Sequence, residues 1–139
     1  MRNAIEVLQA ALKRGVAVRP QVGGFPYLAE SLRVAGVKKN IWNLPSCESI
    51  YLTEAGPVVM IGEPLLTGAA LVPPFNREAL VAALRTDQAG KSSFPEFLQA
   101  TWKAGVVRYV VDFSARKVTY YGCNEEAYAE DYSPVELPK

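Results

Sequence analysis

Hydrophobic residues recur at helical spacing twice in each half of the chain. Ile5, Leu8 and Leu12 lie on one helical stripe, and we expect Gly15 to end this first helix. Ser93 and Glu96 form the pattern of a capping box at the start of the last helix. Three further stripes complete the pattern: Phe25, Leu28, Ala29 and Leu32; Leu80, Val81 and Leu84; Phe94, Phe97, Leu98 and Thr101. The sequence therefore predicts four amphipathic helices.

After Gly36 and again after Gly105 the hydrophobic period changes to two, which is typical of strands with one buried face. Both glycines follow a predicted helix, where a left-handed residue is favoured. Short turns around Pro45 and Ala115 separate the first two strands of each half. The predicted strands span residues 37–44, 49–53, 58–61, 107–113, 118–121 and 127–131.

Four landmarks occur twice and in the same order. The segment from Glu6 to Lys13 resembles that from Glu78 to Arg85, at an offset of 72 residues. Each copy is followed by a Phe-Pro pair, an Ala-Gly-Val triplet and a tyrosine, all at an offset of 69 residues. One short deletion explains the change of offset. The order predicts an internal repeat.

We therefore predict an α+β fold: two ααβββ-type repeats packed with pseudo-twofold symmetry into one domain, with antiparallel sheets and helices on one side. The first repeat covers approximately residues 1–62, a crossover 63–75 and the second repeat 76–139. A unit of about 65 residues buries little of its surface alone, so the two repeats are expected to share a core. Leu65, Leu66 and Leu71 predict that the crossover is packed down.

An ordered set of motifs resembles the YdfO-like family. The motifs are Gly90-Lys91-Ser92-Ser93-Phe94, Ala104-Gly105-Val106, Arg108-Tyr109-Val110 with Asp112, and Tyr120-Tyr121. Members are small prophage-associated bacterial proteins, often labelled "phage envelope protein". The resemblance covers essentially the whole chain and is strongest from Arg77 to Asp131. It implies an α+β fold and supplies no catalytic residue.

Composition narrows the class of protein. Half of the residues are hydrophobic, 21% are charged and the formal net charge is +1, which is typical of a folded domain. Near-neutral charge argues against nucleic-acid binding, because binding phosphate usually needs a basic patch. The chain shows no signal peptide, and its most apolar stretch is too broken to span a bilayer. We predict a soluble, cytoplasmic protein without membrane contact.

Candidate catalytic motifs are weak. Gly90-Lys91-Ser92 lacks the earlier glycine and the preceding strand of a phosphate-binding loop, so a turn between helices is the simpler interpretation. The chain has no histidine, so Cys47 and Cys123 lack the usual base of a nucleophilic thiol. No spacing typical of a metal site occurs. We predict no enzyme activity, no metal and no cofactor.

Four polar or aromatic side chains share one face of a predicted hairpin: Arg108, Asp112, Thr119 and Tyr121. They form either a binding surface or a solvated face with cross-strand pairs worth about 0.2–1 kcal/mol each. The latter is the simpler interpretation, because one face of an antiparallel sheet is often solvated. The equivalent positions of the first repeat are Lys39 and Asn43, so any site is asymmetric.

These observations predict a prophage-type accessory protein that acts by protein–protein interaction without catalysis. Its partner is an unknown protein, and exposed edge strands also allow a homodimer. The alternative is a small-ligand-binding domain with a pocket between the two repeats. An enzyme using carboxylates, lysine or tyrosine ranks third, because it would need a cleft where two titratable groups converge.

Overall fold

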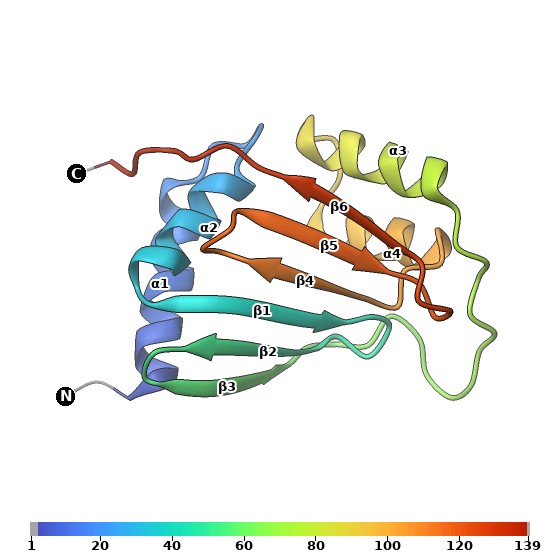
Figure 1. Ribbon diagram of the computed structural model, residues 1–139, viewed down its shortest axis with the longest axis horizontal. Coiled ribbons are helices and arrows are strands. Elements are labelled where there is room, and N and C mark those ends of the chain that lie inside the picture. The colour runs from blue at the N-terminus through green and yellow to red at the C-terminus, as the bar shows by residue number, and fades with distance from the viewer. Residues whose placement is uncertain (1–2, 139) are drawn as a thin grey trace.

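The computed structural model describes residues 3–138. In this part of the chain, two helices precede three strands, and this order occurs twice (Figure 1). The first series is α1 (Ala4–Val18), α2 (Phe25–Val34), β1 (Val37–Asn43), β2 (Glu48–Thr53) and β3 (Gly56–Ile61). The second is α3 (Arg77–Gln88), α4 (Phe94–Lys103), β4 (Arg108–Asp112), β5 (Lys117–Tyr121) and β6 (Ala127–Asp131). The predicted α+β class and the predicted elements are confirmed within a few residues.

All six strands belong to one antiparallel sheet with the order β3-β2-β1-β4-β5-β6. The two halves meet where β1 pairs with β4, so the ladder continues without a break through the middle of the sheet (Figure 1). Ile41 lies opposite Ile50 on one side and Val110 on the other. Each half contributes three neighbouring strands.

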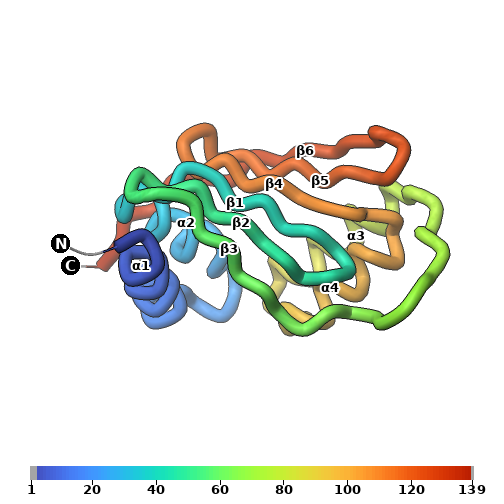
Figure 2. The backbone as a smooth tube through the Cα atoms, turned by 90° about the horizontal axis from the view of Figure 1, so that it is seen from below, coloured from blue at the N-terminus to red at the C-terminus, as the bar shows by residue number. Residues whose placement is uncertain are grey.

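The four described helices cover one face of this sheet (Figure 2). Helices α1 and α2 lie beneath one end and α3 and α4 beneath the other. Alternate strand residues point toward the helices, as the buried Tyr51, Val58, Tyr109, Val111 and Val118 show. One hydrophobic cluster joins these side chains to Leu8, Leu32, Leu80, Leu84 and Phe97 from the helices. The core thus draws residues from both halves.

The helix ends follow the chemistry of their sequences. Ser93 and Glu96 form the predicted capping box, with the Ser93 N–H donating to Glu96 Oε1 and the Glu96 N–H to Ser93 Oγ. Asn76 caps α3 by accepting from the N–H of Ala79 at 3.0 Å. Gly36 and Gly105 follow α2 and α4 with φ of 92° and 88°, the left-handed conformation expected of them.

Gly15 does not end the first helix, which continues to Val18. The residue is buried against α2 instead. A Cβ atom built at Gly15 would lie 2.4 Å from Leu28 Cδ1 and 3.1 Å from Leu28 Cα. The glycine therefore serves the close approach of two helices, which a pattern read along one helix does not reveal.

The crossover between the halves follows the prediction only in part. Leu65 and Leu66 pack against the core, and the Leu65 N–H donates to the carbonyl of Pro45 at 2.7 Å. Leu71, predicted to be packed down, is 95% exposed, so that part of the prediction is wrong. In the described residues 3–138, no helix is both long enough and apolar enough to cross a bilayer.

Strands β3 and β6 form the two edges of the sheet and differ in character. The edge strand β3 is apolar, with Val59 56% and Ile61 78% exposed. It also contains Pro57, which has no backbone N–H. The edge strand β6 ends in the exposed Asp131. Natural sheets often carry proline or charge at such edges, where they discourage pairing with another chain.

Candidate functional site

The four predicted surface residues lie together on the face of the sheet opposite the helices. Arg108 pairs in register with Tyr121, and its guanidinium carbon lies 4.3 Å from the centroid of the tyrosine ring. Thr119 lies opposite Val110 in the middle of the hairpin. Asp112 lies at the other end of β4, four residues from Arg108. The structure brings these side chains onto one face but does not pair Arg108 with Asp112.

Asp112 has a local structural role. Its Oδ1 accepts the backbone N–H groups of Ser114 at 3.1 Å and Ala115 at 3.0 Å, which supports the turn between β4 and β5. Its register neighbours on both sides are lysines, Lys39 in β1 and Lys117 in β5. Asp112 therefore lies between two lysine positions in the register of the sheet.

The face contains a row of uncharged residues that crosses all six strands. Each residue is the register partner of the next: Val59, Ile50, Ile41, Val110, Thr119 and Ala129. We call this the apolar row, although Thr119 carries a hydroxyl. Its first three residues are large and branched, and its last two are small or polar. The sequence predicts Thr119 on this face but does not predict the row, because the continuity of the row depends on the pairing of β1 with β4.

Two further rows flank the apolar row. We call the first of these the charged row, because its last four residues alternate in sign of charge. In register order it consists of Pro57, Leu52, Lys39, Asp112, Lys117 and Asp131. The row on the other side holds Asn43, Arg108, Tyr121 and Ala127 in register, with the paired Glu48 and Ile61 on the other half of the sheet. We call these three rows together the open face.

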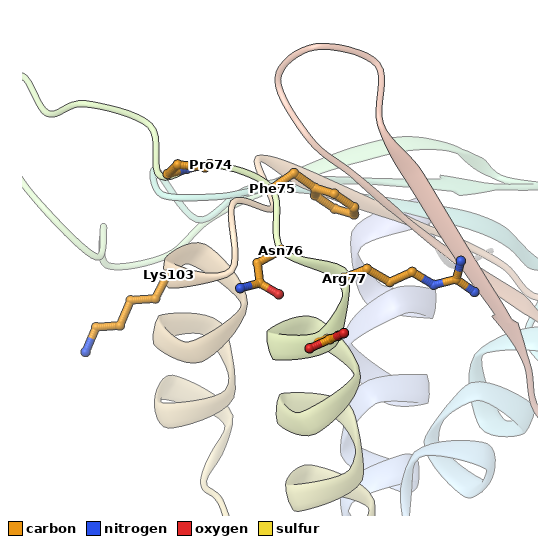
Figure 3. Close-up of a pocket in the computed structure, with 6 residues that line it drawn as sticks. Pro74, Phe75, Asn76, Arg77 and Lys103 are labelled. Atoms are coloured by element: carbon orange, nitrogen blue, oxygen red, sulfur yellow. The ribbon is translucent and has the colours of Figure 1, made fainter.

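Two open depressions lie on the second half rather than between the halves. The larger, of about 520 Å³, is lined by residues 74–78 around the start of α3 and by Lys103 at the end of α4 (Figure 3). Its cationic side chains do not converge: Arg77 extends toward β6, where its guanidinium carbon lies 4.9 Å from the Tyr128 ring, and Lys103 points the opposite way (Figure 3). The second, of about 390 Å³, lies along α4. The predicted pocket between the repeats stays a prediction.

Comparison with known proteins places the chain in a family. A family model described as a protein of unknown function, DUF1398, matches residues 17–131. The chain belongs to the DUF1398 family. Similar proteins include the uncharacterised Rv2012 and MT2067 of two Mycobacterium tuberculosis strains and Mb2035 of Mycobacterium bovis. Each is 53% identical over 136 residues, which cover 98% of this chain and 83% of the relative.

Membership of DUF1398 establishes relatives without establishing an activity. The family is one of unknown function, and these relatives are uncharacterised proteins. The YdfO-like and prophage assignments implied by the sequence resemblance are not tested by these matches and stay predictions.

Two ion-pair clusters connect helices to strands. Arg85 of α3 donates from both terminal nitrogens to Glu130 of β6, at 3.0 and 2.6 Å, and Tyr128 also donates to Glu130. These hydrogen bonds, that of Arg85 first, hold the pKa of Glu130 below its usual value. Arg33 similarly lowers the pKa of Glu30, which also lies 3.7 Å from Arg116 of the β4–β5 turn. Both clusters have an evident structural role.

Burial is the main cause of the pKa shifts of four further groups, which belong to Tyr109, Tyr120, Asp87 and Cys47. Tyr109 and Tyr120 are buried, which raises the pKa of each hydroxyl well above its usual value. Burial also raises the pKa of Asp87, whose Oδ1 accepts from Ser92 Oγ at 3.3 Å. Burial raises the pKa of the Cys47 thiol, which disfavours the reactive thiolate. Within residues 3–138 no three Cys, Asp or Glu side chains gather as a metal site.

Proposed function

We propose that this DUF1398 protein is a non-catalytic interaction protein that binds another protein molecule through its open face. The observation that carries the proposal is the apolar row, which is continuous over six strands on the face opposite the helices. A merely solvated face would be expected to interrupt such a row with charges. Val59 and Ala129 at the two ends of the row are exposed, and the four residues between them are half-buried. Contiguous apolar surface on a folded protein commonly marks a binding surface.

The dimensions of the open face suit a protein partner. Six strands about 4.8 Å apart and three rows about 6.8 Å apart give a projected area of about 600 Å². This is the low end of the area of about 600–1,000 Å² that each partner contributes to a standard interface. Flanking charges around an apolar centre also match the usual arrangement of an interface core and rim.

The titratable groups support a role without catalysis. Glu30 and Glu130 have lowered pKa values because each accepts hydrogen bonds from an arginine that anchors a neighbouring element. The buried tyrosines and Cys47 are shifted away from their charged, reactive forms. These shifts have structural explanations, whereas a catalytic site would bring such groups together around a cleft.

The strand order β3-β2-β1-β4-β5-β6 is symmetric about the seam between β1 and β4, which supports the inference that the halves are two related repeats. We infer a pseudo-twofold axis that passes between β1 and β4, since each half places its strands outward from that seam in the same sequence order. The open face is then made of two related halves, and their side chains have diverged.

Photo-cross-linking in the native host tests the proposed function. A benzoylphenylalanine residue placed at Val110, in the centre of the apolar row, should form adducts with a protein on irradiation. The same residue placed at Leu71, which is 95% exposed in the crossover, is the control and should not. An additional Ile41→Asp change should abolish the adducts. The proposal fails if the folded protein with the probe at position 110 gives no protein adduct.

A further inference from the structure

We infer that the partner of the open face is a second copy of this chain, stacked sheet on sheet about a twofold axis parallel to the strands. The inference rests on the proposed function, because it uses the same face and names the occupant. Under this symmetry β1 of one copy lies over β4 of the other, β2 over β5 and β3 over β6. The axis passes over the seam between β1 and β4.

The side chains of the apolar row are complementary in size under this operation. Ile41 faces Val110 of the second copy, Ile50 faces Thr119 and Val59 faces Ala129, so the larger residues of one half meet the smaller residues of the other. Packed interfaces need such alternation to fill space without voids. Stacked sheets cross at an angle of roughly 30°, so facing residues are displaced more the farther they lie from the axis. The match in side-chain size is therefore closest at the two central strands, β1 and β4.

A twofold axis perpendicular to the strands fits less well. It would place each strand over its own copy, so that Ile50 faces Ile50 and Ala129 faces Ala129. Large residues would then meet at one end of the row and leave a gap at the other, which costs packing energy. The distribution of side-chain size along the apolar row therefore selects the parallel axis.

The charged row is complementary under the same operation. Lys39 of each copy faces Asp112 of the other, so the two copies form two equivalent contacts between opposite charges. Farther out, Lys117 faces Leu52 and can cover it with its aliphatic stem. The formal net charge of +1 opposes the approach of two copies only weakly.

A charge-reversal series measured by sedimentation equilibrium tests the arrangement. The wild-type protein should associate reversibly to a dimer. Lys39→Glu places a carboxylate against Asp112 of the other copy, twice in each dimer, and should raise the dimer Kd about tenfold or more. Lys13→Glu, an equal change of charge on the helical layer, is the matched control and should leave the Kd unchanged.

A second variant separates the interface from the fold. Asp112→Asn removes the charge and retains an oxygen that can accept the N–H groups of Ser114 and Ala115. The double variant K39E/D112N should therefore recover most of the association that K39E loses. Thermal unfolding of each variant checks that the monomer is folded.

The outcomes distinguish this inference from the proposed function. A strict monomer at millimolar concentration overturns the second copy as occupant, while adducts with a different protein at position 110 would still support binding at the open face. A dimer that K39E and Ile41→Asp leave unchanged, as edge pairing through β3 would be, overturns both the arrangement and the use of this face for self-association. A dimer weakened by K39E and recovered by K39E/D112N supports the inference.

Discussion

Replacing Gly105 with alanine should destabilise the protein much more than the same change at Gly36. Both glycines follow the second helix of their half and have nearly the same φ, 88° at Gly105 and 92° at Gly36. An alanine in the left-handed region costs about 1–2 kcal/mol at either position. Comparing the two alanine variants therefore separates the free-energy cost of the backbone conformation from the cost of local packing.

The surroundings of the two glycines differ in what a new methyl group would contact. At Gly105 a Cβ would lie 2.5 Å from Phe75 Cα and 2.6 Å from its nitrogen, both backbone atoms. That backbone is held because the Asn76 N–H donates to the carbonyl of Ala104 at 2.8 Å. At Gly36 the nearest atom is Glu54 Oε2 at 3.1 Å, the end of a flexible side chain. Only the first contact forces the backbone to move.

We therefore expect Gly36→Ala to lower the free energy of unfolding by about 1–2 kcal/mol. Gly105→Ala adds an overpacking cost of about 1–3 kcal/mol and should lower it by about 2–5 kcal/mol in total. Urea unfolding followed by tryptophan fluorescence measures both, with equal m-values required for the comparison. Equal losses for the two variants would refute the reasoning, because they would show that the backbone near Phe75 yields as readily as the Glu54 side chain.

Three further predictions concern stability and reactivity. The folded-state pKa of Glu130 lies below its unfolded value, so its contribution to the free energy of unfolding is fully present above the unfolded pKa and is lost as pH falls through the folded pKa. E130Q should therefore flatten the decline in the free energy of unfolding on acidification, measured by denaturant titrations at several pH values, and an unchanged slope would contradict this. Gly15→Ala should lower the free energy of unfolding by about 1–3 kcal/mol, because the new methyl group would contact Leu28. In a double-mutant cycle, Gly15→Ala with Leu28→Ala should lower it by less than the sum of the two single changes. Native protein should expose one of its two thiols to a thiol reagent, Cys123, while the buried Cys47 reacts only after denaturation; rapid reaction of both would show that the turn around Cys47 opens readily.

The sequence contained most of the local information about the fold. Period and capping residues located the helices and strands, and the capping box at Ser93 is present as predicted. Alternation along β4 and β5 placed Arg108 and Tyr121 on the same face, because the side-chain period of a strand is two. These features depend on residues that are close in sequence.

The features that sequence reasoning missed depend on pairs that are distant in sequence. The apolar row requires β1 to pair with β4 in the register that places Ile41 opposite Val110, and a shift by one residue would move each side chain to the other face. Gly15 was misinterpreted because Leu28, which occupies the space of its missing side chain, lies on another helix. Leu71 was misinterpreted because hydrophobicity alone does not show whether a loop residue finds a partner.

The unlike edges of the sheet also have a consequence for assembly. Strands alternate in direction from β3 to β6, so a copy translated sideways could add its β3 to β6 of the first and continue the same alternation. Such head-to-tail addition has no closing step and produces filaments rather than rings. In such a filament, Pro57 has no N–H to donate, so each junction between copies would lack one backbone hydrogen bond. Asp131 would also place a charge at each junction, which disfavours pairing. These two residues therefore favour discrete particles over open-ended growth.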